Sequence, residues 1–373
     1  ADSEEKAQIP RFYSTQMQVM INTLNDMPLS DNRVSGSQGI GILMSNSLMF
    51  QRFPTHQGYD DPQLSNFYGQ ALPLLKRGVP VKTVHIENVS VLKTWEDVKI
   101  LVMSYSNMKP MEKQAHGYIG EWVKKGGILV YSGRDEDPFQ TVQEWWNTDG
   151  NNFKAPSEHL FGKLGLKAPF EAGEYTVGRG KVVILRNDPK EFVLTEGNDL
   201  EYVSTIKKMY DSDSRSEDLE FKNHFSLTRG PYEIISVVNE NEDQSAYTVK
   251  GKYIDLFDPE IPVLDEKKVN PGEQAFLYNI QSVQNAKTPQ VLAAAARIYE
   301  EKFSDTEYSF VAKSPKNTTN VMRILLPEKA EKIEITDQQG KALLAETSWD
   351  ESSKTYFLSF ENYPDGVQVK LSW

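Results

Sequence analysis

Apolar residues in the first 210 positions come in short runs that alternate with amphipathic segments. Residues 10–27 repeat apolar side chains every three or four positions, which predicts a helix. Similar helical patterns cover residues 64–75 and 110–123, and glycine follows each of them before the next apolar run. The runs that predict buried strands lie at residues 39–44, 79–86, 99–105 and 128–131. This alternation predicts βαβ units around a parallel sheet.

The pattern changes from about residue 150 onwards. Residues 175–185 predict a hairpin with a glycine turn, and residues 200–210 predict a helix. The polar, acidic stretch at 211–218 is the best candidate for a domain boundary. Beyond it, short strand-like runs are separated by turn residues, which is typical of β-sandwich domains. One helix is expected in this half, with its apolar face formed by Val291, Leu292, Ala295 and Ile298.

Four parts of the chain follow from these patterns. We expect a helical lead-in over residues 1–35 and an α/β domain over residues 36–210. A β-rich domain is expected over residues 219–285, and a C-terminal β-sandwich with a preceding helix over residues 286–373. The predicted fold class is therefore a parallel α/β sheet followed by all-β, sandwich-like domains.

Composition and charge narrow the partners and the chemistry. The chain has 373 residues and a formal net charge of -12, without a Lys/Arg cluster. Nucleic acid is not expected as a partner, because phosphate binding needs a concentrated basic face. No apolar run reaches the length of about 18 residues that a membrane span needs. The sequence has no Cys, and its His residues lack metal-ligand spacing, so no metal or other cofactor is expected.

Three segments carry a resemblance to a known family. They are the apolar run 99–102, the helix end and strand at 121–130, and the glycine and acidic loop at 133–137. In this order they resemble the class I glutamine-amidotransferase-like domain of glycoside hydrolase family 42 β-galactosidases and related bacterial glycosidases. The resemblance implies a flavodoxin-like sheet in a domain usually called the trimerisation domain, which lies after the catalytic barrel. It also implies self-association, carbohydrate as a partner, and a periplasmic or extracellular location.

One departure from the amidotransferases concerns the nucleophile. True class I amidotransferases use a Cys on a strand-to-helix elbow, and this sequence has none. Ser132 is the only nearby hydroxyl, and the Gly-x-Ser-x-Gly pattern of a serine elbow is absent. We therefore interpret Ser132 as a turn residue, with a catalytic role as the minor alternative.

Acidic and aromatic residues follow the same predicted strand. Asp135 and Asp137 lie at its carboxyl end, where ligands of open α/β sheets bind. A solvated loop with an Asp capping the next turn is favoured, and contact with a sugar is the alternative. The other candidates could form a stacking platform or border this edge, although core packing and a plain surface loop are favoured for them: Tyr131, Trp145, Trp146, His159 and His56.

The function expected from these features is a non-catalytic accessory and oligomerisation region, with possible glycan binding, of a secreted glycoside hydrolase. The alternating region supplies five or six strands, too few for an eight-stranded barrel, which needs about 250 residues. A second hypothesis is a hydrolase that cleaves glycosidic or ester bonds with Asp135 or Asp137 and His56 or His159. A third is a free-standing glycan-binding protein. The start of the sequence has no basic and apolar signal pattern, so we expect either a removed signal or a chain cut from a longer one.

Overall fold

The chain forms two compact units in a computed structural model that describes residues 9–29, 32–50, 64–213, 217–283 and 288–373. Unit 1 comprises Ala1–Val34, His224–Asn239 and Asp243–Trp373. Unit 2 comprises Ser35–Asn223 and Glu240–Glu242. Apart from Glu240–Glu242, unit 2 is therefore an insertion in the chain of unit 1.

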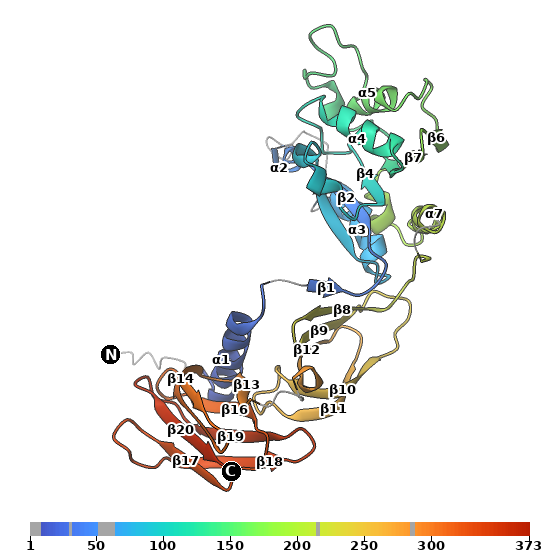
Figure 1. Cartoon of the computed structure of the whole chain (residues 1–373). Coiled ribbons are helices and arrows are strands. Elements are labelled where there is room, and N and C mark those ends of the chain that lie inside the picture. The colour runs from blue at the N-terminus through green and yellow to red at the C-terminus, as the bar shows by residue number, and fades with distance from the viewer. Residues whose placement is uncertain (1–8, 30–31, 51–63, 214–216, 284–287) are drawn as a thin grey trace, which may run out of the picture. The chain divides into compact units, whose positions relative to one another are not determined.

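A six-stranded mixed sheet forms the centre of unit 2, in the order β3-β2-β4-β5-β7-β6 (Figure 1). The first five strands in this order pair in parallel, and β6 is antiparallel to β7 at one edge. The parallel pairing and the hairpin predicted from the sequence are both confirmed. The strands are β2 (Ile40–Met44), β3 (Val81–His85), β4 (Ile100–Met103), β5 (Ile128–Ser132), β6 (Gly173–Val177) and β7 (Gly180–Leu185).

Both faces of this sheet are covered by helices, which explains why its central strands β4 and β5 are apolar at nearly every position. Leu101 and Met103 of β4 join one core with α4 and α5, whereas Ile100 and Val102 join the other with α3, α6 and α7. The helices of unit 2 are α2 (Ser47–Phe50), α3 (Ser65–Leu75), α4 (Ala115–Lys124), α5 (Pro156–Lys163), α6 (Glu191–Leu194) and α7 (Leu200–Asp211). Its 3-10 turns are η2 (Ile86–Asn88), η3 (Leu92–Trp95) and η4 (Pro138–Thr141).

Unit 1 contains a six-stranded antiparallel sheet in the order β1-β8-β9-β12-β10-β11. Strand β1 precedes the insertion in the chain and pairs with β8, the first strand after the insertion. In this pairing Val34 lies opposite Leu227. A 3-10 turn, η5 (Ile280–Ser282), follows the sheet. The strands are β1 (Asn32–Val34), β8 (His224–Arg229), β9 (Tyr232–Val237), β10 (Tyr247–Asp255), β11 (Val263–Val269) and β12 (Gln274–Asn279).

The C-terminal part of unit 1 has two four-stranded antiparallel sheets around one apolar core. Their orders are β13-β16-β19-β18 and β14-β15-β20-β17. The first sheet contains β13 (Gln290–Ala294), β16 (Thr319–Leu325), β18 (Ala345–Asp350) and β19 (Thr355–Glu361). The second contains β14 (Arg297–Phe303), β15 (Glu307–Lys313), β17 (Lys332–Thr336) and β20 (Val367–Ser372).

The helix expected around residues 291–298 is wrong. This stretch forms β13 and the start of β14 instead. Alanine favours helix in isolation, but here Ala294 and Ala296 face the core of the two four-stranded sheets, while Ala293 and Ala295 pack on a second core with α1. Burial of alternate alanines in two different cores has overridden the helix preference of alanine, because a strand directs successive side chains to opposite faces.

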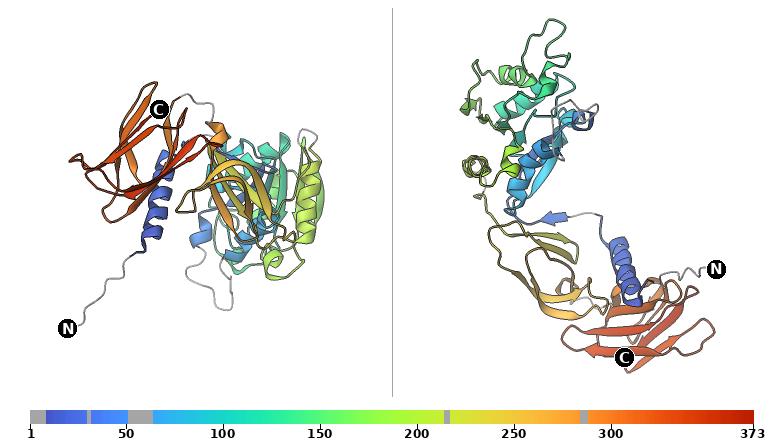
Figure 2. Two further views of the ribbon diagram at one scale, coloured as in Figure 1. Left: turned by 90° about the horizontal axis from the view of Figure 1, so that it is seen from below. Right: turned by 180° about the vertical axis from the view of Figure 1, so that it is seen from behind.

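The N-terminal helix is confirmed as α1 (Arg11–Asp26), which lies against β13 and β16 (Figure 2). Its buried residues are Thr15, Val19, Asn22 and Thr23. The amide of Asn22 donates a hydrogen bond to the carbonyl oxygen of Ala294 at 3.2 Å. The apolar repeat that predicted the helix does not form its buried face, since Met17, Ile21 and Leu24 are exposed.

Candidate functional site

The carboxyl ends of the parallel strands of unit 2 hold a group of polar side chains that bond one another. We call this group the edge network. It is built from the end of β5, from the loops after β4, β5 and β7, and from the start of α5. Its members are Lys109, Tyr131, Asp135, Asp137, Ser157 and Arg186.

Asp135 is the carboxylate of the edge network that accepts hydrogen bonds from three side chains. Its backbone lies in the left-handed region with φ of 61°, which turns the side chain back over the end of β5. It accepts hydrogen bonds from the Tyr131 hydroxyl, from Ser157 Oγ at 2.7 Å and from Arg186 Nη1 at 3.0 Å. Burial raises its pKa, while these donors and the charge of Lys109 act in the opposite direction.

Asp137 forms a buried ion pair with Lys109. The Oδ2 and Nζ atoms are 2.6 Å apart, and the two side chains are only 4% and 3% exposed. Lys109 Nζ also donates to the carbonyl oxygen of Tyr105 at 2.7 Å, and Asp137 Oδ1 accepts from the amide of Phe139 at 3.0 Å. Burial lowers the pKa of Lys109, and the adjacent Asp137 opposes that effect. The ion pair thus fastens the loop after β4 to the loop after β5.

His159 belongs to a pair of imidazoles. Its Nδ1 lies 2.8 Å from Nδ1 of His116, whose Nε2 lies 2.6 Å from the Tyr105 hydroxyl. Burial lowers the pKa of His116 to about 3, with contributions from His159 and Lys163. Burial lowers the pKa of His159 as well. Both rings are therefore neutral near pH 7, and each one's Nδ1 is engaged with the other rather than with a Ser or Asp side chain.

Ser132 connects two strand ends. Its side chain is fully buried, and Oγ donates to the carbonyl oxygen of Asn187 at 2.7 Å. The amide of the next residue, Gly133, donates to the carbonyl oxygen of Leu185 at 3.1 Å. Activation of a serine requires a base that accepts its proton. In the structure the hydroxyl proton is directed to a backbone carbonyl.

The predicted aromatic candidates pack mainly inside unit 2. Tyr131 is fully buried, and Trp146 is 2% exposed, with Nε1 donating to the carbonyl oxygen of Gln140 at 3.2 Å. Trp145 is half-buried and packs edge-on against His116 and His159. Among the aromatic candidates that the structure describes, Trp145 and His159 are only partly buried. His56 lies outside the described residues.

Sequence reasoning did not find several members of the edge network. Lys109 and Arg186 come from two separate loops and Ser157 from the start of α5, and no motif links them. The only signal available was that Lys109 and Arg186 follow apolar strands, because the ends of parallel strands meet at one edge. A pocket of about 160 Å³ lies on unit 2, lined by Ile86 and Tyr118 among others, and no edge-network residue lines it.

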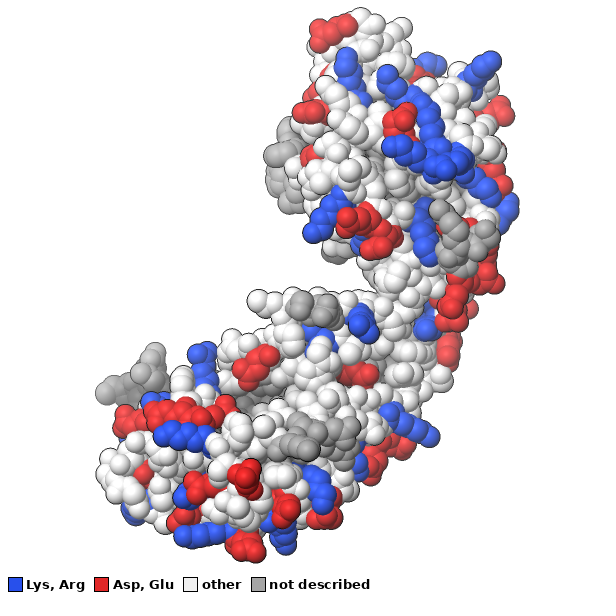
Figure 3. Space-filling model, viewed as in Figure 1, with Lys and Arg blue, Asp and Glu red and all other residues white. Residues whose placement is uncertain are grey.

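Some broader features of the described residues bear on the chemistry. Among residues 9–29, 32–50, 64–213, 217–283 and 288–373, no three His, Asp or Glu side chains come together as metal ligands. Within the same ranges, no helix has the length and apolar character to cross a membrane. On the face that Figure 3 shows, side chains of both charges occur on each unit.

Comparisons with known proteins find likeness only among solved structures. No protein-family model matches the chain, and no curated protein matches it. A β-galactosidase from Bacillus circulans sp. alkalophilus is 8% identical, with 71% of this chain and 43% of that chain covered and a TM-score of 0.41. A glycoside hydrolase family 42 β-galactosidase from G. stearothermophilus, as a catalytic mutant, is 12% identical, with 65% and 40% covered and a TM-score of 0.38.

A rhamnosidase from Novosphingobium sp. covers more of the chain. It is 11% identical, with 90% of this chain and 34% of that chain covered and a TM-score of 0.31. The chain therefore spans less than half the length of each of these three structures.

Proposed function

We propose that this chain is a non-catalytic accessory region of a carbohydrate-active protein related to glycoside hydrolases. One observation carries the proposal: the acid, base and hydroxyl candidates of unit 2 bond one another or the backbone. Asp135 has three donors, Asp137 is paired with Lys109, and the Ser132 hydroxyl donates to a backbone carbonyl. Because these side chains are bonded within the protein, they hold the loops after β4, β5 and β7 in place, which is a structural role.

We also propose that unit 2 is a class I glutamine-amidotransferase-like domain. Two features support this. The parallel strands follow the chain order second, first, third, fourth, fifth, which is the flavodoxin-like order. Ser132 ends the central strand β5, where an amidotransferase elbow would begin. Self-association, which the sequence resemblance implies, remains a proposal that light scattering on the purified chain can test.

One feature favours a hydrolase as the second candidate. A glycosidase needs a carboxylic acid whose pKa is raised so that it can donate a proton, and burial raises the pKa of Asp135. However, each oxygen of Asp135 already accepts a hydrogen bond from the protein, Oδ1 from Tyr131 and Oδ2 from Ser157 and Arg186. The accessory role accounts for these bonds without requiring them to break.

Turnover by the purified chain separates the two candidates. The chain is incubated with p-nitrophenyl glycosides and p-nitrophenyl acetate, and nitrophenolate release is measured against a buffer blank. We expect release at the rate of the blank, and we expect Asp135→Asn to leave that rate unchanged while lowering thermal stability. Turnover by the wild-type chain that disappears in Asp135→Asn would establish the hydrolase instead. Glu121→Gln, an exposed change on α4, controls for the loss of a carboxylate.

A further inference from the structure

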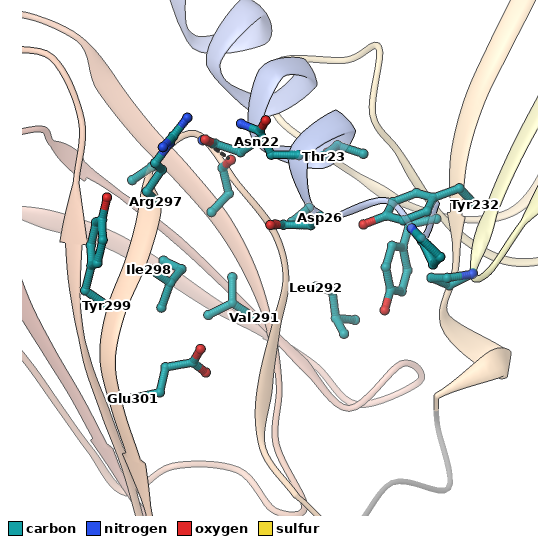
Figure 4. Close-up of a pocket in the computed structure, with 17 residues that line it drawn as sticks. Asn22, Thr23, Asp26, Tyr232, Val291, Leu292, Arg297, Ile298, Tyr299 and Glu301 are labelled. Atoms are coloured by element: carbon teal, nitrogen blue, oxygen red, sulfur yellow. Dashed lines mark hydrogen bonds between the residues drawn. The ribbon is translucent and has the colours of Figure 1, made fainter. Parts of the chain in front are cut away.

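A second region of the molecule, in unit 1, has the geometry of a binding site. A pocket of about 670 Å³ lies between the last turn of α1 and strands β13 and β14 (Figure 4). Its volume is within the range of about 300–1,000 Å³ that is usual for small-molecule sites. Buried tyrosines line its inner part, and charged side chains line its opening. We call it the α1–β14 pocket.

The inner part of the α1–β14 pocket contains two tyrosine hydroxyls. Tyr232 and Tyr278 are only 5% and 6% exposed, and their rings pack edge to face with centroids 5.2 Å apart. Within the described residues, neither hydroxyl makes a hydrogen bond to protein. The Tyr232 hydroxyl points towards Asp26 in Figure 4. Burial raises the pKa of both residues, that of Tyr278 to about 12, so each is a neutral donor and acceptor.

Neither hydroxyl oxygen is among the fully enclosed atoms without a partner, so both are open to the pocket and take their hydrogen-bond partners from what fills it. Two unpaired hydroxyls that face one pocket therefore suggest that a partner comes from outside the protein. Water could supply single bonds, but the pocket is much larger than the space that one water needs. A ligand with several hydroxyl groups can satisfy both tyrosines at once.

Charged side chains of both signs surround the opening of the α1–β14 pocket. Asp26 comes from the end of α1, and Arg297, Tyr299 and Glu301 come from β14. Although Asp26 is exposed, burial of part of its surface raises its pKa, with Arg297 lowering it and Glu301 raising it. Glu301 also accepts a hydrogen bond from the Tyr308 hydroxyl. Among the described residues, Arg297 and Asp26 form no ion pair within 4 Å, so both remain available to a ligand.

These groups define the chemistry of the ligand. The pocket offers carboxylate acceptors, a guanidinium donor, hydroxyls that do both, and aromatic rings beside them. Two carboxylates against one guanidinium disfavour an anionic ligand. A purely apolar ligand would leave the tyrosine hydroxyls unpaired. An uncharged molecule with several hydroxyl groups on an amphipathic ring can bond the carboxylates, the guanidinium and the hydroxyls and can pack against the aromatic rings.

The geometry points to a binding site for a neutral oligosaccharide in the α1–β14 pocket, in which sugar hydroxyls bond Tyr232, Tyr278 and Asp26. The choice of ligand class rests on the proposed function, since an accessory region of a carbohydrate-active protein meets glycans. The location of the site does not rest on the proposed function, because it follows from the pocket and from the hydroxyls of Tyr232 and Tyr278.

Calorimetric titration of the whole chain tests this site. The probes are cellotriose, maltotriose, β-1,4-galactotriose and mannotriose, with trigalacturonic acid as the anionic counterpart. We expect at least one neutral trisaccharide to bind with one-to-one stoichiometry. The double variant Tyr232→Phe/Tyr278→Phe removes only the two hydroxyls, and we expect it to raise the dissociation constant by about tenfold or more. Its thermal midpoint should equal or exceed that of the wild type, because no protein hydrogen bond is lost.

Two controls make the result specific. Tyr363→Phe removes a hydroxyl from an exposed tyrosine that does not line the pocket, and it should leave the dissociation constant unchanged. Trp145→Ala in unit 2 should do the same. The site is refuted if no neutral trisaccharide binds, if the double variant binds as the wild type does, or if trigalacturonic acid binds more tightly. Release of nitrophenolate in the turnover assay would refute the proposed function while leaving this outcome untouched.

Discussion

At the scale of single residues, the ion pair between Lys109 and Asp137 is the most consequential contact of unit 2. Its side chains are 3% and 4% exposed, so removing one partner leaves a charge buried without compensation. We expect Lys109→Met to lower the free energy of unfolding of unit 2 by about 3 kcal/mol. Urea denaturation followed by tryptophan fluorescence measures this, since four of the six Trp residues lie in unit 2.

An exposed lysine provides the matched control for that change. Lys124 pairs with Glu121 on the surface of α4 at 3.3 Å, and such pairs contribute about 0–1 kcal/mol. Lys124→Met should therefore have little effect. The double variant Lys109→Met/Asp137→Asn should recover part of the loss, because neither buried charge remains. Equal stabilities for the Lys109 and Lys124 variants would contradict a structural role for the edge network.

The imidazole pair predicts how stability depends on pH. Burial lowers the pKa of His116 from 6.5 to about 3, so below pH 6.5 the unfolded chain binds a proton that the folded chain does not. Stability is then fully present above pH 6.5 and falls as the pH drops towards 3, by about 1 kcal/mol per pH unit. Urea denaturation at pH 7, 6 and 5 measures this slope. His116→Gln should flatten it, and an unchanged slope would show that other groups cause it.

The residue scale is where sequence reasoning reached least far. The sequence predicts a solvated loop at 135–137 in which an Asp caps the next turn. Asp137 does cap that turn, but the expected solvation is wrong, because the side chains of Asp135 and Asp137 are only 10% and 4% exposed. The partners of these carboxylates could not be found, because Lys109 and Arg186 lie 28 and 51 residues away in the chain. Only the three-dimensional convergence of parallel strands brings them together. For Tyr232 and Asp26, no sequence pattern marks the pocket at all.

At the scale of elements, two helical glycines of unit 2 differ in how closely other parts of the chain pack against them. A Cβ on Gly69 in α3 would lie 1.9 Å from the carbonyl oxygen of Pro189, whereas a Cβ on Gly117 in α4 would meet nothing within 4 Å. Gly69→Ala should lower the free energy of unfolding by about 3 kcal/mol, since backbone must move. Gly117→Ala should raise it by about 1 kcal/mol through helix propensity. Thermal denaturation followed by circular dichroism tests both, and changes of the same sign would contradict this packing.

Apolar patterning located most elements but not which side of them is buried. The central strands of unit 2 needed no further information, because burial on both faces makes nearly every position of β2, β4 and β5 apolar. In α1 the helical span was predicted, yet the buried side carries Thr15, Asn22 and Thr23, and the apolar repeat lies outside. The alanine-rich stretch before Arg297 is predicted as a helix but forms a strand. The reason is related, because its conformation is decided by the two cores on which it packs. Neither partner is visible in local sequence.

At the scale of the whole chain, the insertion of unit 2 into unit 1 occurs at a defined point of one sheet. Val34 of β1 lies opposite Leu227 of β8, so the chain leaves unit 1 and returns to it on neighbouring antiparallel strands. Antiparallel neighbours are commonly joined by loops of about 2–5 residues. Unit 1 also has apolar cores formed without residues of unit 2. It therefore has the means to fold without the insertion.

Replacing residues 35–223 by a linker of about four Gly and Ser residues tests this. We expect the shortened chain to be monodisperse and rich in β-structure by circular dichroism, and to unfold cooperatively on heating. Fluorescence of Trp349 and Trp373, the two Trp residues of unit 1, should shift at that same transition. A companion variant, in which Asn32, Arg33 and Val34 are also removed, loses the β1–β8 pairing and should unfold at a lower temperature. If the first protein fails to fold while residues 35–223 alone do fold, unit 1 depends on its insertion to fold, and the expectation is wrong.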